Sequence, residues 1–182
     1  MGKSVSIVVP CFNEVDYLPG LFQSFLFQTY AAEDLCMYLV DGGSTDGSLN
    51  IAHQFAQENE RLFVINNPKQ YTPFALNLGI NASKSDVVII LGAHATMHPD
   101  FVKNSVDALF SNEKIACAGG VINNVYSNQE AQNIGNAMSS RFGVGNATFR
   151  TGGKAGYVDT VAFVYDRRSI FEEVVLFDEQ LI

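Results

Sequence analysis

The sequence is poor in basic side chains and in long apolar runs, and each shortage excludes a class of protein. Only 11 of the 182 residues are Lys or Arg, against 19 Asp or Glu, which gives a formal net charge of −8. Because phosphate backbones are bound through clustered Lys and Arg, we expect no nucleic-acid partner. In the middle of the chain the longest apolar run covers residues 87–91, whereas a membrane-spanning helix needs roughly 20 residues. The residues that precede the first β-rich run are too few for a signal peptide. We therefore expect neither a signal peptide nor a membrane segment in this chain.

Cysteine is also scarce: Cys11, Cys36 and Cys117 are odd in number, far apart and without metal-ligand spacing. Each lies in or beside an apolar run. We therefore expect buried free thiols and a reducing, cytoplasmic compartment. With 47% hydrophobic and 16% charged residues, the chain has the composition of one ordered domain that buries a core.

Short β-rich runs alternate with helical patterns along the first half of the chain. This alternation predicts an α/β fold, Rossmann-like, with a mostly parallel central sheet and helices on both faces. The predicted strands cover residues 5–10, 37–40, 62–66, 86–91, 115–121 and 157–165. The predicted helices cover residues 18–26, 72–82, 101–110, 131–142 and 167–173, together with one that follows Ser48 and runs through Gln57.

Three predicted helices begin at capping signals. A Ser or Thr of the turn at 41–48 is expected to cap the helix that runs through Gln57. Thr72 is expected to cap the next helix, with Pro73 as its first helical residue. His98-Pro99-Asp100 repeats this arrangement before the helix at 101–110.

From Asn123 to Gly156 the composition shifts to Asn, Ser and Gly. Such a stretch in a compact domain is usually functional or mobile. We treat 1–182 as a single domain with a core at 1–122 and a second region at 123–182. The last residues carry no terminal cap or tail, and we expect the natural chain to continue past Ile182.

Polar clusters follow three of the predicted parallel strands. They are Pro10-Cys11-Phe12-Asn13-Glu14, Asp41-Gly42-Gly43-Ser44 and Gly92-Ala93-His94. Ligands of an open parallel sheet collect at the carboxyl ends of its strands, so the three clusters together predict a site. Each cluster alone is also ordinary turn or helix-entry chemistry. Neither Gly-x-Gly-x-x-Gly nor Gly-x-x-x-x-Gly-Lys follows the first strand, which argues against a nicotinamide dehydrogenase and a P-loop enzyme.

Three blocks of the sequence carry a family resemblance. They are SIVVPCFNE at 6–14, VDGGSTDGS at 40–48 and ALNLGINA at 75–82. In order and approximate spacing they resemble the family-2 glycosyltransferases, which have the GT-A fold. Val158-Asp159-Thr160-Val161, with Tyr165, Arg168 and residues 176–179, is similar to the branch that includes succinoglycan-type exopolysaccharide transferases.

The resemblance implies a pocket for a nucleotide sugar, with a UDP-sugar as the expected donor. The implied donor-binding residues are Pro10, Phe12, Asn13, Glu14, Asp41, Gly43, Asn77 and Ala93. Asp41 has the chemistry to accept the imide N–H of uracil, and Glu14 to accept a ribose hydroxyl. Asn77 is expected near the diphosphate, and Lys69 is the nearest basic side chain, with a plain surface lysine as the alternative.

The chain departs from the family pattern where an Asp-x-Asp usually holds Mg²⁺ or Mn²⁺ against the diphosphate. The corresponding residues here are Gly92-Ala93-His94. Mg²⁺ prefers oxygen ligands, whereas imidazole suits softer metals. The related exopolysaccharide branch resembles Asp-Ala-His at this place, which implies His94 as the metal ligand and Gly92 as a loss. Binding of Mg²⁺ or Mn²⁺ therefore stays open. His94 and His98 are four residues apart, but Pro99 indicates that the helix begins after them, which argues against a zinc pair.

The resemblance also places the catalytic base, one carboxylate of a Glu-Asp pair, beyond Ile182. Asp178 and Glu179 are then expected to be structural. The implied activity of a longer protein is inverting sugar transfer to a saccharide or lipid-linked acceptor in polysaccharide biosynthesis. On this interpretation residues 1–122 form a nucleotide-binding core and 123–182 begin an acceptor-side region.

Two alternatives to this activity remain. The Gly at position 92 leaves open a non-catalytic nucleotide-sugar-binding module. A sugar nucleotidyltransferase needs a Gly-rich loop with a basic residue after the first strand, where this chain has Phe12-Asn13-Glu14 instead.

Overall fold

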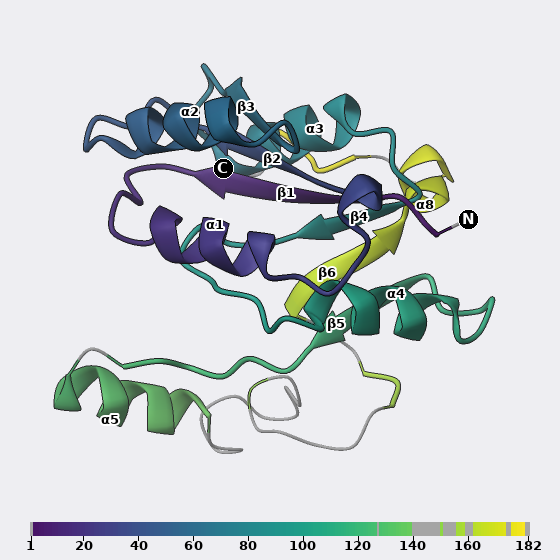
Figure 1. Cartoon of the computed structure of the whole chain (residues 1–182). Helices are drawn as coiled ribbons and strands as arrows, with labels where there is room; N and C mark the ends of the chain where they lie inside the picture. The colour runs from purple at the N-terminus through teal and green to yellow at the C-terminus, as the bar shows by residue number, and fades with distance from the viewer. Residues whose placement is uncertain are drawn as a thin grey trace.

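The computed structural model describes residues 2–126, 128–139, 150, 156–158, 162–173 and 176–180. In this part of the chain six strands form one sheet in the order β3-β2-β1-β4-β6-β5 (Figure 1). The strands are β1 Val5–Cys11, β2 Leu35–Asp41, β3 Leu62–Asn66, β4 Val87–Ile90, β5 Cys117–Gly120 and β6 Ala162–Arg167. The helices are α1 Leu18–Leu26, α2 Ser48–Glu58, α3 Thr72–Ala82, α4 Phe101–Phe110, α5 Gln129–Met138 and α8 Arg168–Glu173, with a 3₁₀ turn η1 at Ala32–Asp34.

The first four strands of the chain are parallel, as the sequence predicted. β1 lies at the centre and pairs in parallel with β2 and β4, and β2 pairs in parallel with β3. β6 runs antiparallel to both β4 and β5. The carboxyl ends of β1, β2, β3 and β4 therefore meet at one edge of the sheet, where ligands of such folds bind.

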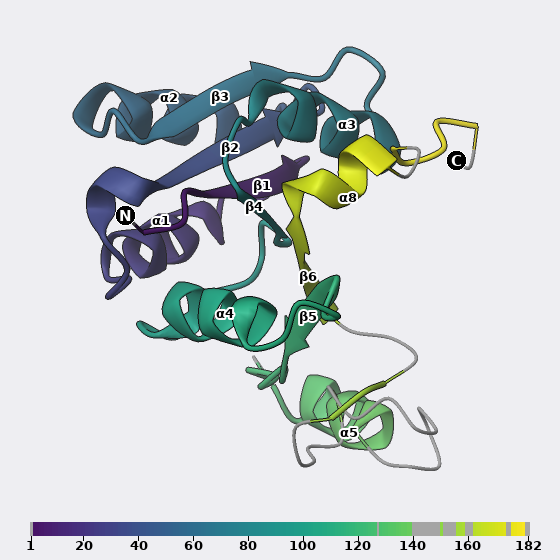
Figure 2. The same ribbon diagram turned by 90° about the vertical axis from the view of Figure 1, so that its right-hand side faces the viewer.

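Helices cover both faces of the sheet, which confirms the predicted architecture. Alternate residues of β1 serve the two faces, since side chains of a strand point to opposite sides. Ile7 packs in a core with Leu21 and Phe25 of α1, to which α2 and α4 also contribute. Val8 packs on the opposite face with Ile80 of α3. Figure 2 shows α3 and α8 next to each other on this second face.

Helix α3 lies unusually close to the sheet because it presents a glycine to it. A Cβ atom at Gly79 would collide with Cγ1 of Val8 and would lie 3.3 Å from Cγ2 of Val40. Only a residue without a side chain allows this approach of helix backbone to strand. The close packing brings the N-terminus of α3 to the carboxyl edge of the sheet.

The predicted hydroxyl caps are wrong. Ser48 is the first residue of α2, and Gly47, at φ 104°, precedes it without a side-chain cap. The Ser48 amide instead donates to Asp46 Oδ1 at 2.9 Å. Thr72 is likewise a helical residue of α3 rather than its cap, and Asp100 at the start of α4 makes no side-chain capping bond. The Ser48 hydroxyl is committed elsewhere, because it donates to Asp46 and accepts from the neighbouring loop.

The strand predicted at 157–165 is displaced in the structure. Residues 156–158 lie outside any strand, and β6 covers Ala162–Arg167. The pairing of β6 with β4 sets its position, because Arg167 lies opposite Val87. β5 is also shorter than predicted, covering Cys117–Gly120 rather than 115–121. A local pattern does not encode these choices of partner and register.

Helix α5 begins two residues earlier than predicted and ends at Met138. The Asn128 side chain accepts a hydrogen bond from the amide of Ala131 at 2.8 Å and so caps the helix. The segment at 140–142, which the prediction also made helical, lies outside the described residues. Both Figure 1 and Figure 2 show α5 apart from the layers of sheet and helix.

The expected burial of three thiols holds for one of them. Cys11 is buried, Cys36 is half-buried and Cys117 is exposed. Cys117 belongs to β5, the strand at the end of the sheet, where a neighbouring strand covers only one side. Among the described residues, no helix has the length and apolar character needed to cross a bilayer.

Candidate functional site

A hollow of about 360 Å³ opens at the carboxyl edge of the parallel strands. Its walls come from the ends of β1, β2 and β4, from the loop between β3 and α3, and from the first turns of α3. This is the edge at which the three polar clusters were expected to meet. Its size lies within the range of ordinary small-molecule sites.

Five of the residues expected in the site line this hollow: Pro10, Phe12, Glu14, Ala93 and His94. Phe12 keeps 53% of its surface exposed, so its ring is available at the rim. Gly42 forms part of the wall beside it. A Cβ at Gly42 would lie 3.5 Å from Phe12 Cδ2 and from the carbonyl oxygens of Cys11 and Gln70, so the missing side chain keeps this corner open.

Asp41 and Gly43 do not line the hollow, because the Asp41 carboxylate holds its own loop. Asp41 is 1% exposed. Its Oδ2 accepts from the amides of Gly43 at 2.9 Å and Ser44 at 3.0 Å, and its Oδ1 accepts from the Ser44 hydroxyl at 2.5 Å. Bonds from backbone N–H groups to a carboxylate fix a turn of this kind. The Asp41 carboxylate therefore stabilises the turn that contains Gly42.

Asn13 also lies outside the hollow and joins the loops that follow β1 and β2. Its amide donates to the Ser44 hydroxyl at 2.9 Å, and its side-chain Oδ1 accepts from the Thr45 amide at 2.8 Å. It has a φ of 55°, a conformation that Asn tolerates better than most residues. These bonds set the position of Glu14, the next residue, whose amide donates to Ser48 Oγ at 2.8 Å.

Glu14 and His94 meet across the hollow. Nδ1 of His94 lies 3.2 Å from Oε1 of Glu14, and the Tyr17 ring meets the imidazole edge-on at 6.3 Å between centroids. The His94 side chain is 66% exposed and the Glu14 side chain 21%. Because an ionised carboxylate only accepts, this contact places the hydrogen of a neutral imidazole on Nδ1.

The imidazole of His94 also lies over Gly92. A Cβ at Gly92 would be 3.4 Å from Cε1 and 3.5 Å from Nε2 of the ring. A longer side chain at position 92 would extend into the space beside the ring. Because Gly92 has no side chain, the His94 ring occupies this corner of the site.

The residues of this corner do not fit a Mg²⁺ or Mn²⁺ site. The described residues contain no group of three or more His, Cys, Asp or Glu side chains that could hold a metal ion. His94 and Glu14 offer one nitrogen and one carboxylate, whereas Mg²⁺ is usually held by oxygen ligands alone, namely one or two carboxylates, water and the phosphates of its substrate. His98 does not line the hollow, and its Nδ1 accepts from the amide of Asp100 at 3.2 Å.

Asn77, expected near a diphosphate, instead holds the C-terminal segment. Its Nδ2 donates to the carbonyl of Phe177 at 2.9 Å, and its Oδ1 accepts from the amide of Phe177 at 3.0 Å. Nδ2 also lies 3.0 Å from Oε1 of Glu179. Glu179 therefore makes a structural contact, in line with the role expected for it.

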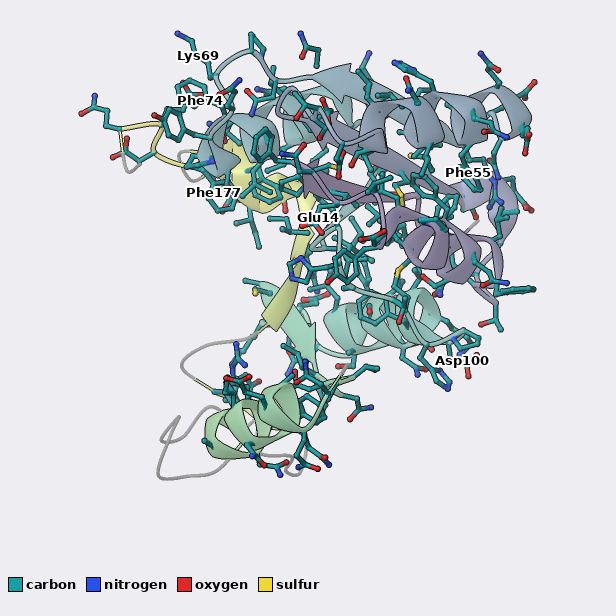
Figure 3. The ribbon with its side chains drawn as sticks, turned by 90° about the vertical axis from the view of Figure 1, so that its left-hand side faces the viewer. Glu14, Phe55, Lys69, Phe74, Asp100 and Phe177 are labelled. Carbon is teal, nitrogen blue, oxygen red and sulfur yellow. The ribbon has the colours of Figure 1, made fainter. Side chains whose placement is uncertain are left out.

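Lys69 stands apart from the hollow. Its ammonium group lies 5.8 Å from the centre of the Phe74 ring. Figure 3 shows Lys69 and Phe74 together at the edge of the molecule, whereas Glu14 lies nearer its middle. This placement agrees with the alternative interpretation, in which Lys69 is a plain surface lysine.

Sequence reasoning missed the loop between β3 and α3, which supplies Asn67 and Gln70 to the hollow beside Thr72 of α3. Asn67 is 1% exposed, and its amide donates to the carbonyl of Asp41 at 2.7 Å. It follows β3 directly, as the recognised clusters follow the other three parallel strands. The same rule, applied to the third strand, would have found it.

Cys11 is the buried thiol of the site. Burial in the first place, and the neighbouring carboxylates of Asp41 and Glu14 after it, raise the pKa of the Cys11 thiol to about 12. The thiol therefore stays protonated at neutral pH and acts as a small apolar wall of the hollow.

The sequence of the chain also matches a known protein family. The profile of "Glycosyl transferase family 2" matches residues 6–174. The chain belongs to glycosyl transferase family 2. The match includes all three sequence blocks on which the resemblance was based.

Curated relatives of this glycosyltransferase chain include two from polysaccharide and lipid-linked sugar assembly. The dolichyl N-acetyl-α-D-glucosaminyl phosphate 3-β-D-2,3-diacetamido-2,3-dideoxy-β-D-glucuronosyltransferase of Methanococcus voltae is 30% identical over 98% of the chain and 57% of that protein. The succinoglycan biosynthesis protein ExoA of Rhizobium meliloti is 28% identical over 95% of the chain and 52% of that protein. The chain thus spans about half the length of these relatives. The block at 158–161, expected to mark the succinoglycan-type branch, lies mostly outside the described residues.

Solved structures show the same fold. The mannosyltransferase PcManGT of Pyrobaculum calidifontis, in complex with GDP-Man and Mn²⁺, superposes with a TM-score of 0.74 at 19% identity, over 98% of this chain and 48% of that one. Staphylococcus aureus TarS in complex with UDP gives a TM-score of 0.72 at 16% identity, over 98% and 51%. The family-2 chain therefore has the GT-A fold that the sequence predicted.

Proposed function

We propose that the hollow binds the nucleoside diphosphate of a nucleotide sugar, and that uridine is the nucleoside. The observation that carries the proposal is the position of the hollow: the loops after β1, β2 and β4 meet there, and two of these loops belong to the family blocks. Solved relatives support the ligand class, since TarS was solved with UDP and with UDP-GlcNAc. PcManGT was solved with GDP-Man, so guanosine is the nucleoside to test against.

The shape of the rim suggests how a base would bind. Phe12 offers an exposed aromatic face, and Gly42 leaves the neighbouring wall without a side chain. We assign the base to the exposed side of the Phe12 ring, because stacking on an aromatic ring contributes about 1–3 kcal/mol per base. The buried Asp41 serves by holding the turn around Gly42, and we assign the ribose hydroxyls to Glu14.

A longer protein containing this chain is proposed to transfer the sugar with inversion to a saccharide or lipid-linked acceptor. The names of the two curated relatives support that acceptor class, one acting on a dolichyl phosphate sugar and one in succinoglycan synthesis. On this proposal residues 1–122 bind the donor, 123–182 begin the acceptor side, and a carboxylate beyond Ile182 is the base. The reaction would take place on the cytoplasmic side, where nucleotide sugars are made.

A second candidate is a nucleotide-sugar-binding module without turnover. The glycine at position 92 favours it, because the usual first carboxylate of the Asp-x-Asp is missing. An assay of a chain extended past Ile182 to the length of its relatives separates the two. Release of UDP that depends on acceptor supports the transferase, whereas tight donor binding without release supports the module.

Calorimetric titration with UDP tests the donor site itself. We expect UDP to bind more tightly than GDP, and Phe12→Ala to weaken UDP binding by about tenfold, because about 1.4 kcal/mol of stacking is lost. Phe27→Ala is the matched control: Phe27 is also an exposed phenylalanine, at 64%, and lies outside the hollow. Equal losses in the two variants would refute the assignment of the base to the rim at Phe12.

A further inference from the structure

We propose that this site binds its donor diphosphate without a divalent cation, because the Glu14–His94 pair occupies the corner where the family holds one. The inference rests on the proposed donor site and adds a property that the family resemblance alone does not give. It depends on the geometry of Gly92, His94 and Glu14.

The absence of a side chain at Gly92 leaves space for the His94 ring. The imidazole lies 3.4–3.5 Å from the position of a Cβ at residue 92, which is ordinary van der Waals contact. An aspartate there would need room for its carboxyl group beyond the Cβ, on the side where the ring now lies. Glycine at this position therefore lets His94 fold back toward Glu14.

The contact between His94 and Glu14 reduces the lone pairs that are available to a metal. Nδ1 of His94 carries a hydrogen that faces Oε1 of Glu14 at 3.2 Å, so neither atom offers a free lone pair along that contact. Nε2 is then the ring's one remaining donor to a cation. Oε2 of Glu14 adds a carboxylate oxygen, so the corner offers one imidazole nitrogen and one carboxylate where Asp-x-Asp offers two carboxylates. This is a weaker site for Mg²⁺ or Mn²⁺, which both favour carboxylate, carbonyl and water ligands.

In this proposal the first turn of α3 holds the diphosphate. Helix α3 begins at this edge, Thr72 of its first turn lines the hollow, and no side chain caps its N-terminus. Amide N–H groups of an uncapped first turn carry partial positive charge and favour anions. The hydrogen of the neutral His94 ring faces Glu14, so the ring donates nothing to the diphosphate. Within the described residues, the amides of this turn, except at Pro73, which has no N–H, take over the contact that a cation makes elsewhere.

Calorimetric titration with UDP in excess chelator, and again with Mn²⁺, tests the inference. We expect the two dissociation constants to agree within about twofold, and manganese resonance spectra to show no bound Mn²⁺ without UDP. Binding that is about tenfold or more tighter with Mn²⁺ would overturn the inference and leave the donor site intact. Absence of UDP binding under both conditions, in protein shown to be folded by its unfolding transition, would refute the donor site and the inference with it.

Restoring the carboxylates provides the converse test. The double variant Gly92→Asp/His94→Asp is expected to bind UDP at least about tenfold more tightly with Mn²⁺ than with chelator. Gly92→Ala is the matched control, because its Cβ fits beneath the ring and adds no carboxylate; the ratio of the two affinities should stay near one. A double variant that ignores Mn²⁺ would contradict the assignment of this corner as the place of the missing cation.

Discussion

The close approach of α3 to the sheet makes Gly79 the position at which the smallest change should be most costly. In Gly79→Ala the new methyl group collides with Cγ1 of Val8 and lies 3.3 Å from Cγ2 of Val40. Overpacking of a core costs about 1–3 kcal/mol, and a collision with a buried Val8 methyl belongs to the upper half of that range, about 2–3 kcal/mol. Alanine favours a helix interior over glycine by about 1 kcal/mol. The collision outweighs this gain, so we expect a net loss of about 1–2 kcal/mol in the free energy of unfolding.

Urea unfolding followed by circular dichroism measures this loss. Gly20→Ala in α1 is the matched control, since its methyl group would meet Thr96 Cγ2 at an ordinary 3.5 Å; it should be neutral or stabilising by up to about 1 kcal/mol. In a Val8→Ala background only the 3.3 Å contact with Val40 remains, so Gly79→Ala should cost less there than in the parent chain. If Gly79→Ala were as stable as the parent chain, the packing of α3 that forms one wall of the hollow would be refuted.

Three further predictions concern side chains around the fold. Asn77→Ala should lower the free energy of unfolding by about 1–3 kcal/mol and speed amide exchange in the C-terminal segment that Asn77 holds, because two part-buried hydrogen bonds to the Phe177 backbone are lost; unchanged exchange would contradict the clamp. The backbone and hydroxyl bonds from Ser4 hold the pKa of Asp86 below its ordinary value, so its stabilisation is complete above about pH 4 and is lost as the pH falls through the lower folded value. Asp86→Asn should therefore be less stable than the parent at pH 7, with the difference shrinking in acid; a constant difference would argue against the assignment. Iodoacetamide at pH 8 should label the exposed Cys117 well before Cys11, whose thiol is buried with a pKa of about 12; the reverse order would refute that burial.

Apolar patterns in the sequence predicted the first strands and most helices because such patterns report burial. α1 has the bounds that the spacing of its apolar residues indicated, and α3 and α4 have the bounds that were placed from their Pro-containing start signals. The capping groups were predicted less well. The hydroxyl of Ser48, expected as a local cap, bonds to Asp46 and to Glu14, 34 residues away. A competing partner that is distant in sequence is invisible to a local rule.

The same limit explains the mixed outcome at the site. The strand-end rule predicted the location of the hollow, and Pro10 and Phe12 line it. The orientation of individual side chains depended on long-range contacts. Asn77 turns to Phe177, 100 residues away, and His94 to Glu14, 80 residues away.

Mapping the UDP-bound chain by hydrogen exchange tests the central claim most directly, because it locates the ligand without assuming which residues bind it. The account predicts that UDP slows exchange at residues 10–14, 40–44, 67–72 and 90–94, which surround the hollow, and leaves α5 unchanged. Slowed exchange confined to α5, or spread over the molecule without these four segments, would contradict the placement of the donor site at the carboxyl edge of the sheet.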